Sequence, residues 1–368
     1  PCTDRSCGWC SAHNDPGALL KKWFGFDSFR SKPAGQDGRP LQEAIVTAAL
    51  AKKPLLGILP TGTGKSVCYQ LPALAQFDKT GALTVVISPL VALMTDQVES
   101  LKRQGISSSV TINGMLSLPE RTEALDRVRL GDAAILIISP EQLRSPSIRS
   151  VLKQREIAYW VLDEAHCISK WGHDFRPDYR YVARFIKEYS GDERPAPLIC
   201  LTATAKPSVI RDILEHFRIK LGEAPQLIDG GAVRDNLSFE VVSTSAVQKN
   251  GDIVSVIETV LPRHGVSGAI VYCSTRAAAE NVAGFLKEKG FAAAHYHAGL
   301  KPEAKLEVQR DFSNGDLRVI AATNAFGMGI DKPDIRLVVH GDIPGSLENY
   351  VQEAGRAGRD RNEARCIL

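Results

Sequence analysis

The stretch Pro60-Thr61-Gly62-Thr63-Gly64-Lys65-Ser66, directly after the apolar run Leu55–Leu59 and before a helical pattern, decides the fold of this chain. A strand, a glycine-rich turn and a helix N-terminus together bind phosphate, because backbone N–H groups close on its oxygens and the helix dipole favours negative charge. Lys65 is expected to reach the β- and γ-phosphates of ATP, and Ser66 to bind Mg²⁺. The rest of the ATP cradle is expected to consist of Thr61, Gly62, Thr63 and Gly64.

The strict phosphate-loop pattern requires glycine at the position of Leu59. In this departure the loop resembles that of superfamily 2 helicases, which commonly lack the same glycine, so the departure indicates a subclass. The alternative is a chance glycine-rich turn, which the strand pattern before it and the helix pattern after it argue against.

Short β-branched runs alternate with stretches of helical length through most of the chain. Such alternation predicts an α/β fold with parallel sheets covered by helices on both faces. Ligands of such sheets bind at the carboxyl ends of the strands. The expected strands are Leu55–Leu59, Leu83–Ile87, Ala134–Ile138, Ala158–Leu162, Leu198–Leu201, Phe239–Ser243, Ala269–Cys273, Arg318–Ala321 and Ile335–His340. The clearest helices are Val91–Arg103, Pro207–Phe217 and Arg276–Lys289.

The stretch Ile219–Asn236 contains Gly and Pro and few periodic apolar positions, so we interpret it as a linker between two α/β domains. The predicted organisation is a cysteine-rich segment at 1–16, an ATP-binding domain at 17–230 and a second domain at 231–368.

The composition is that of a globular protein, with 44% apolar and 24% charged residues among 368. No apolar run reaches the roughly 18 residues that a membrane-spanning helix needs, and no signal peptide is visible. We therefore expect an intracellular protein, cytoplasmic or nuclear, without a membrane partner. A net charge of +3 is compatible with a polyanionic partner but is weak evidence for one. Because the chain begins at Pro1 and ends in a strand-like Cys366-Ile367-Leu368, we expect further domains in a longer protein.

Asp163-Glu164-Ala165-His166 follows the expected strand Ala158–Leu162. A carboxylate at a strand end beside a phosphate loop is where a second Mg²⁺ contact belongs, which assigns that role to Asp163. Glu164 is next in line to polarise the attacking water, since phosphoryl transfer depends chiefly on positioning and charge stabilisation.

Arg356 and Arg359 lie in Gln352-Glu353-Ala354-Gly355-Arg356-Ala357-Gly358-Arg359-Asp360, far along the second domain. We expect both arginines on a helix, from which they stabilise negative charge on the γ-phosphate in the transition state. The alternative is a solvated basic helix face. The small residues between the arginines argue against it, because they allow close approach to another surface.

The segment from Asp163 to Tyr179, DEAHCISKWGHDFRPDY, resembles the RecQ family of DNA helicases, whose aromatic-rich loop follows the DEAH string. Six further stretches are similar to the family's motifs in order, and the resemblance covers roughly residues 20 to 368. They are Ser88-Pro89-Leu90 through Asp96-Gln97, Ser139-Pro140-Glu141-Gln142-Leu143, Leu201-Thr202-Ala203-Thr204-Ala205, Val271-Tyr272-Cys273-Ser274-Thr275-Arg276, Tyr296-His297-Ala298-Gly299 and Ala322–Pro333.

The resemblance implies two RecA-like domains that couple ATP hydrolysis to 3′-to-5′ movement on single-stranded DNA and to unwinding, in repair or recombination. The implied partners are single-stranded and tailed duplex DNA. It further implies that Gly329 and Asp331 lie at the nucleotide, and that His166, Thr202 and Thr204 couple DNA to hydrolysis.

The aromatic loop has a physical rationale of its own. Trp171 and Phe175, with His173 and Arg176, place stacking faces and a cation beside the hydrolytic carboxylates. Stacking of a base on such side chains contributes about 1–3 kcal/mol and tolerates any base, as a translocating motor requires. The alternative is that both aromatic rings fill core, but a segment with Gly, His, Asp, Arg and Pro is poor core material.

Two departures from the family stand out. The family's adenine-recognition glutamine lies 23 residues before the phosphate-loop lysine, and Gln42 occupies that position. Phe29-Arg30 is separated from Gln42 by an apparent insertion, Ser31–Gly38, which leaves open whether Arg30 or Arg39 takes the arginine role. The zinc-binding and winged-helix modules that usually follow the motor are absent from this chain.

Cys2, Cys7, Cys10 and His13 lie within twelve residues, and the Cys-x2-Cys step suits a tetrahedral Zn²⁺ site. The other spacings fit no common zinc finger, so the alternative is unliganded thiols on a frayed terminus. The remaining cysteines stand singly among apolar neighbours, which predicts buried, reduced thiols. They are Cys68, Cys167, Cys200, Cys273 and Cys366.

Two rival functions remain at this stage. An RNA helicase is disfavoured because the aromatic loop follows the RecQ pattern. A nucleic-acid-binding adaptor with an inactive motor is opposed by the intact Lys65, Asp163, Glu164 and Arg359, since a dead motor usually loses at least one such residue.

Overall fold

The structure, a computed structural model, describes the whole chain apart from residues 1–6, 36, 90, 171–174, 204–205, 231–233, 262–264 and 327–331, and apart from the side chains of residues 10–12, 92 and 302. Its internal contacts divide the chain into two compact units, Pro1–Ala232 (unit 1) and Val233–Leu368 (unit 2).

Unit 1 is built on a seven-stranded sheet in the order β3-β4-β2-β5-β6-β1-β7, and every pairing is parallel. Parallel neighbours cannot be joined by a tight hairpin, so helical crossovers connect the strands and cover both faces. The strands are β1 (Leu55–Ile58), β2 (Leu83–Ile87), β3 (Ser109–Ile112), β4 (Ile135–Ile138), β5 (Ile157–Leu162), β6 (Leu198–Thr202) and β7 (Gln226–Asp229).

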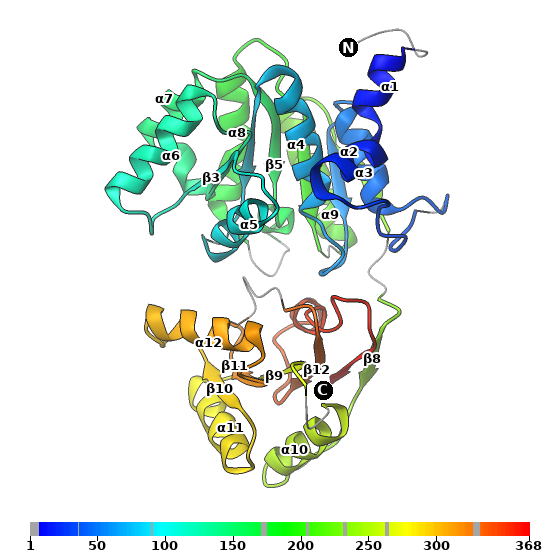
Figure 1. Cartoon of the computed structure of the whole chain (residues 1–368), viewed down its shortest axis with the longest axis vertical. Coiled ribbons are helices and arrows are strands. Elements are labelled where there is room, and N and C mark those ends of the chain that lie inside the picture. Colours follow the sequence, from blue (N-terminus) through cyan, green and yellow to red (C-terminus); the bar gives the residue numbers. More distant parts are fainter. Residues whose placement is uncertain are drawn as a thin grey trace. The chain divides into compact units, whose positions relative to one another are not determined.

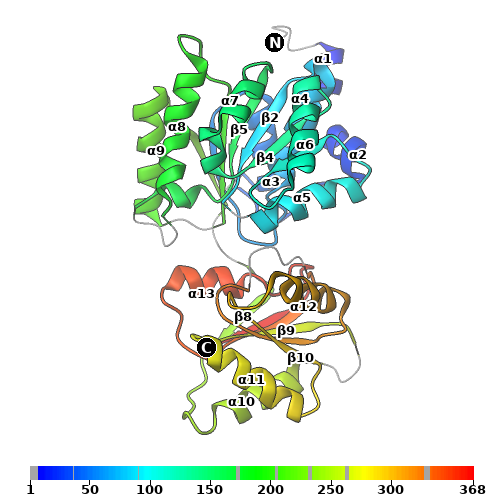
Figure 2. The same cartoon turned by 90° about the vertical axis from the view of Figure 1, so that its left-hand side faces the viewer.

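The helices of unit 1 form a layer on each side of this sheet (Figures 1 and 2). Alternate residues of a strand point to opposite faces, so Trp160 of β5 packs in one core while its neighbours Tyr159 and Val161 pack in the other. The helices are α1 (Gly8–Asn14), α2 (Pro16–Phe24), α3 (Leu41–Leu50), α4 (Val67–Thr80), α5 (Val91–Arg103), α6 (Leu118–Leu130), η1 (Pro140–Arg144), α7 (Pro146–Leu152), η2 (Ala165–Ile168), α8 (Pro177–Ser190) and α9 (Pro207–Leu221).

Unit 2 repeats the plan with a six-stranded parallel sheet in the order β10-β11-β9-β12-β13-β8. Ala269 and Val271 of β9 face one core, and Ile270 faces the other. The elements are β8 (Leu237–Glu240), α10 (Lys249–Val260), β9 (Gly268–Tyr272), α11 (Arg276–Glu288), β10 (Ala293–Tyr296), α12 (Pro302–Asn314), β11 (Val319–Ala322), β12 (Ile335–His340), α13 (Leu347–Ala354) and β13 (Ala364–Ile367).

The expected fold class is thus confirmed: two parallel sheets, each covered by helices. The predicted linker Ile219–Asn236 is wrong in its first half, because α9 continues to Leu221 and β7 (Gln226–Asp229) pairs with β1 in the first sheet. β7 is an edge strand with mostly exposed side chains, so it lacks the apolar run that marked the others.

The five single cysteines are buried, as expected: Cys68, Cys167, Cys200, Cys273 and Cys366. Among the described helices, none is both long and apolar enough to cross a bilayer.

Strand order brings the predicted site together within unit 1. The sheet places β5, β6 and β1 side by side, in that order. Their carboxyl ends lead into the DEAH string, Thr202 and the phosphate loop respectively. Three sequence motifs more than 30 residues apart therefore emerge at one edge of the sheet.

Candidate active site

The phosphate loop occupies the turn between β1 and α4. Gly62 and Gly64 have φ angles of 75° and 77°, a left-handed conformation that costs glycine little and other residues more. Thr63 Oγ1 donates a 2.6 Å hydrogen bond to the carbonyl of Pro60, which closes the turn on itself. The loop ends at Ser66, where α4 begins. The sequence therefore gives the loop the shape that the phosphate-binding prediction requires.

Gln42, on the first turn of α3, packs directly against this loop. Its side-chain Nε2 donates to the carbonyls of Thr63 (2.8 Å) and Gly64 (3.0 Å). A Cβ atom at position 64 would lie 2.7 Å from that nitrogen and would displace the Gln42 amide from these hydrogen bonds, and the φ of 77° at Gly64 also disfavours a side chain there. The structure thus places Gln42 beside the phosphate loop; its contact with adenine stays a prediction.

Of the two arginines left open by the sequence, Arg30 is the one at the loop. Its guanidinium donates to the carbonyl of Gly62, and its backbone N–H donates to Gln42 Oε1 at 3.1 Å. Arg39 instead forms an ion pair with Glu43 (3.3 Å), where its side chain is 47% exposed. Ala34 and Pro40 form an antiparallel bridge, and Leu41 N–H donates to the carbonyl of Pro33.

Lys65 and Glu164 form an ion pair across the site, with Nζ 2.9 Å from Oε1 and both side chains largely buried. Glu164 adopts a left-handed backbone conformation (φ 49°, ψ 49°), which is strained for a residue with a side chain. Burial alone would raise the pKa of Glu164, but the nearby Lys65 and His166 outweigh it and lower the pKa. Glu164 is therefore held as a carboxylate that faces the phosphate-loop lysine.

Asp163 lies deeper, at the end of β5, and is 6% exposed. Burial raises the pKa of Asp163 to about 6, against the positive charge of Lys65. Tyr179 fixes the backbone here, because its hydroxyl donates to the carbonyl of Asp163 at 2.8 Å. A buried carboxylate whose negative charge is poorly compensated is a suitable ligand for a cation.

The donor set fits Mg²⁺, which prefers oxygen ligands. The hydroxyl of Ser66 and the carboxylate of Asp163 are both oxygen donors at the same edge of the sheet. These two residues are the ones that would hold the ion.

His166 connects the DEAH string to the end of β6. Its Nδ1 shares a 2.9 Å hydrogen bond with Thr202 Oγ1 and lies 3.3 Å from Glu164 Oε2. Both His166 and Thr202 are buried. A displacement at the end of β6 would therefore reach the carboxylate of Glu164 through one imidazole ring, which is the geometry that coupling requires.

The aromatic segment is described only in part. Trp171 and His173 lie outside the described residues, as does Thr204 of the segment after β6. Phe175 is half-buried. The guanidinium of Arg176 donates a hydrogen bond to the carbonyl of Pro89 at 2.7 Å. The backbone N–H of Arg176 donates to the carbonyl of Cys167 at 2.9 Å. Arg176 thus ties this segment to the chain after β2.

The prediction that Arg356 and Arg359 lie on a helix is wrong. α13 ends at Ala354, and both arginines lie in the turn that follows. Gly355 and Gly358 explain the difference, because glycine ends helices and Gly358 takes a positive φ of 55°. Arg356 is 8% exposed, which rules out a solvated basic face.

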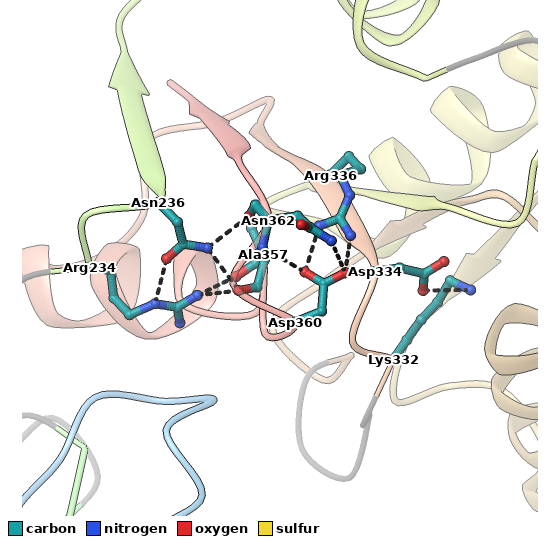
Figure 3. A network of polar contacts seen from close by, with 9 residues as sticks. Arg234, Asn236, Lys332, Asp334, Arg336, Ala357, Asp360 and Asn362 are labelled. Carbon is teal, nitrogen blue, oxygen red and sulfur yellow. Dashed lines mark hydrogen bonds and ion pairs between the residues drawn. The ribbon is translucent and has the colours of Figure 1, made fainter. Parts of the chain in front are cut away.

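Arg234 and Asn236 hold this arginine-bearing turn from outside α13 (Figure 3). The guanidinium of Arg234 donates to the carbonyls of Ala357 (3.0 Å) and Gly358 (2.6 Å). The amide of Asn236 donates to the carbonyls of Gly358 (2.9 Å) and Asn362 (2.8 Å). Sequence reasoning missed both residues, although Arg234-Asp235-Asn236 is a polar group just before a strand in a stretch interpreted as linker.

Two ion pairs complete the network in Figure 3. Arg336 of β12 binds Asp360 through two hydrogen bonds, one of 3.0 Å. Lys332, 3% exposed, pairs with Asp334 at 3.1 Å. Gly329 and Asp331, predicted to lie at the nucleotide, fall outside the described residues.

The N-terminal cluster is also described only in part. Cys2 and the side chain of Cys10 are outside the described residues. Cys7 precedes α1, and His13 on that helix shares a 2.8 Å hydrogen bond with the carbonyl of Trp9 and stacks on the Trp9 ring. Zinc binding by the four residues stays a prediction.

The two halves of the chain match two known families. The family described as DEAD/DEAH box helicase matches residues 39–213, and the helicase conserved C-terminal domain matches residues 252–361. The first match includes the phosphate loop and the DEAH string, and the second includes the arginine-bearing turn.

Curated relatives are similar over nearly the whole chain. The ATP-dependent DNA helicase RecQ of Bacillus subtilis is 40% identical over 95% of this chain and 55% of its own length. RecQ of Pasteurella multocida is 38% identical over 95% of this chain and 51% of its own length. The ATP-dependent helicase SGS1 of Saccharomyces cerevisiae is 39% identical over 89% of this chain and 22% of its own length. The chain therefore spans about half the length of the bacterial relatives.

Solved structures share the fold at low identity. The helicase MrfA bound to DNA superimposes with a TM-score of 0.73 at 21% identity, over 96% of this chain and 50% of its own. The DEAD-box helicase Mss116 bound to single-stranded RNA superimposes with a TM-score of 0.73 at 18% sequence identity, over 89% of this chain and 69% of its own. These likenesses show that the chain has a RecA-like fold. Taken with the matched families and the identity to RecQ proteins, they show that the chain belongs to the RecQ family of superfamily 2 helicases and spans its two-domain core.

Proposed function

We propose that this chain is the ATP-hydrolysing motor of a DNA helicase, which moves 3′-to-5′ along single-stranded DNA and separates duplex DNA in repair or recombination. The observation that carries the proposal is the meeting of Lys65 with Glu164 at 2.9 Å, beside the buried Asp163. These are the groups that phosphoryl transfer to water requires. Family membership supports DNA as the nucleic acid.

In this proposal the ammonium of Lys65 binds the β- and γ-phosphates and leaves Glu164 free to orient the attacking water. Ser66 and Asp163 hold Mg²⁺, which when bound neutralises charge on the phosphates. Arg356 and Arg359 stabilise the charge that develops on the transferred group. Gln42 recognises adenine, with Arg30 beside it, and Gly329 and Asp331 contact the nucleotide.

The DNA-coupling part of the proposal rests on the path from Glu164 through His166 to Thr202. Trp171, His173, Phe175, Arg176 and Thr204 supply the contacts to the strand. The partners are single-stranded and tailed duplex DNA together with further domains of a longer chain, and the protein acts where DNA is, in the cytoplasm of a bacterium or in a nucleus.

The test is an ATPase assay with single-stranded DNA, duplex DNA and RNA as competing activators. We expect single-stranded DNA to stimulate turnover most, and Lys65→Ala to abolish turnover with every activator. Stronger stimulation by RNA would favour an RNA helicase instead. Absence of turnover with all three nucleic acids would favour an adaptor with an inactive motor.

A further inference from the structure

Three residues of unit 2 that the proposed function does not use gather at one edge of its sheet. They are Glu280 on α11, His295 on β10 and His297 just after β10. One ligand atom from each lies within 4.8 Å of the other two. Imidazole nitrogen and carboxylate oxygen are the donors that Zn²⁺ and its neighbours in the transition series prefer.

The fold brings these residues together for simple reasons. Residues two apart on a strand face the same side of the sheet, so His295 and His297 project with Ala293. Ala293 packs in the core that α11 covers, together with Ala279, the residue before Glu280. Among the described strands, β10 is the outermost one of this sheet and pairs with β11.

The contacts within the cluster already resemble those of a partly assembled site. His297 is 6% exposed, and its Nε2 lies 2.9 Å from Glu280 Oε1. Nδ1 of the same ring is buried and has no hydrogen-bond partner among the described residues. The His295 ring stacks on the His297 ring, with centroids 5.3 Å apart and planes at 9°.

A surface hydrogen bond between one histidine and one glutamate would account for Glu280 and His297, but not for the second imidazole. A neutral imidazole has a lone pair available for a metal ion. Two imidazoles and one carboxylate also match the protein ligands of many three-residue zinc sites, in which water is the fourth ligand.

We propose that Glu280, His295 and His297 bind one divalent ion of borderline softness, Zn²⁺ foremost, with water completing the coordination. The donors must approach to about 3.3 Å from one another to share an ion at Zn–N distances of about 2.0–2.1 Å. The two imidazoles reach this arrangement by turning out of their stack about χ2, a torsion that is broad in histidine. The backbone of β10 need not move.

The bound ion would join the first half of α11 to the end of the outermost strand. Because the three ligands are close together only when unit 2 is folded, Zn²⁺ binding stabilises the folded unit by mass action. Mg²⁺ does not compete effectively, since it prefers six oxygen ligands in an octahedron.

The experiment titrates Zn²⁺ into the full chain with Cys2, Cys7 and Cys10 changed to Ser and His13 to Ala, which removes the N-terminal donors. Calorimetry measures the stoichiometry and affinity, and thermal melting measures the stabilisation. We expect one Zn²⁺ per chain and a rise in Tm that excess Mg²⁺ does not reproduce.

Two substitutions then test the ligands: His295→Gln on the strand, and Glu280→Gln at an exposed helix position where folding is not at risk. Each should weaken Zn²⁺ binding by about tenfold or more and remove the rise in Tm. Glu288→Gln, at an exposed position two turns further along α11, is the matched control and should bind as the parent does. Unchanged affinity in both ligand variants, or no Zn²⁺ binding by the parent chain, would overturn the proposal.

Discussion

In the proposed reaction Lys65 interacts with two anionic groups, the carboxylate of Glu164 and the phosphates of ATP, and the structure shows the first of these contacts. Its ammonium lies 2.9 Å from Glu164 Oε1, while the phosphate-loop role requires the same group to bind ATP. A charge-assisted contact of this kind is among the stronger hydrogen bonds in a protein. Binding of ATP must therefore exchange one anion for another at Lys65, and that exchange sets Glu164 free.

The first prediction concerns Glu164→Gln. The substitution removes the negative charge that competes for Lys65, so ATP should bind at least as tightly as in the parent chain. Turnover should fall by about 100-fold or more, because the group that orients and deprotonates water is lost. Equilibrium binding of a fluorescent ATP analogue and steady-state ATPase measure the two effects. Glu193→Gln, at an exposed position, is the control, and turnover within a few-fold of the parent would refute the role of Glu164.

At the residue scale, spacing predicted the carboxylates and Gln42 but not their neighbours. The family's spacing of 23 residues before the phosphate-loop lysine selected Gln42, which lies on the first turn of α3 beside the loop. The choice between Arg30 and Arg39 depends on how residues 33–41 fold, and the hydrogen bond between Pro33 and Leu41 is a tertiary feature. No local pattern reveals which arginine such a contact leaves beside the loop.

At the scale of elements, helix periodicity succeeded where apolar faces are regular. Val91–Arg103 was predicted with the bounds of α5. The error at α13 arose because the turn with Arg356 and Arg359 continues the composition of the helix while its glycines end it. β7 was missed for a different reason: its place at the sheet edge leaves Gln226, Leu227 and Asp229 exposed.

The second prediction belongs to the segment between η2 and α8. If Trp171 stacks on bases, Trp171→Ala should lower DNA-stimulated ATPase several-fold, at about 1–3 kcal/mol per stacked base, and leave the basal rate unchanged. ATPase with and without single-stranded DNA measures this, and circular dichroism checks the fold. Trp23→Phe, on α2 away from the segment, is the control. An unfolded Trp171→Ala chain would support the core-filling alternative.

The third prediction concerns the junction of β9, β12 and α10. The carboxylate of Asp342 accepts hydrogen bonds from Lys249 Nζ (2.6 Å) and from the backbone (2.8 Å) and hydroxyl (2.9 Å) of Ser274. Burial alone would raise the pKa of Asp342, but these hydrogen bonds and the charge of Lys249 outweigh burial and lower the pKa. An unfolded aspartate, with a pKa of about 3.9, therefore takes up its proton before the folded one does. The stability that Asp342 contributes is full above that pH and is lost as the pH falls below it.

Asp342→Asn should consequently be less stable than the parent at pH 7 and should lose less stability between pH 5 and pH 3. The four tryptophans all lie before residue 232, so urea unfolding seen by circular dichroism but not by tryptophan fluorescence reports unit 2. Asp316→Asn, at an exposed position, is the control. Parallel stability–pH curves for Asp342→Asn and the parent would contradict the prediction.

At the scale of the whole molecule, the alternation of apolar runs and helical stretches was sufficient to predict two parallel sheets. The sequence could not supply the strand order β3-β4-β2-β5-β6-β1-β7, because the pairing of strands is set by contacts between distant segments. That order places Thr202 beside His166, so the hydrogen bond between these two residues became visible only in the structure. Lys65, Asp163 and Glu164 lie after strands that the pattern predicted, whereas Arg356 and Arg359 follow a helix.

The fourth prediction follows from the extent of the chain, which spans about half the length of its bacterial relatives. All groups proposed for hydrolysis are present, whereas strand separation needs surfaces that grip and split a duplex. Phosphate contacts dominate affinity for DNA, and a net charge of +3 provides few of them. We expect DNA-stimulated ATPase, weak and strongly salt-dependent DNA binding, and poor unwinding of long duplexes.

Measuring ATPase and strand separation on one tailed duplex at two salt concentrations tests this. A tenfold shorter duplex region is the control, and should be separated more readily. Efficient unwinding of the long duplex by the 368-residue chain would show that these residues contain a duplex-splitting element of their own.

Arg234 has a mechanical consequence. It is the second residue of unit 2, and its guanidinium holds the carbonyls of Ala357 and Gly358, between Arg356 and Arg359. Arg234 precedes β8 in the chain, so a force applied at Arg234 would load its hydrogen bonds to the arginine-bearing turn before the hydrogen bonds between β8 and β13. In the proposed function Arg356 and Arg359 stabilise charge on the γ-phosphate, so such a force would act directly beside these two arginines.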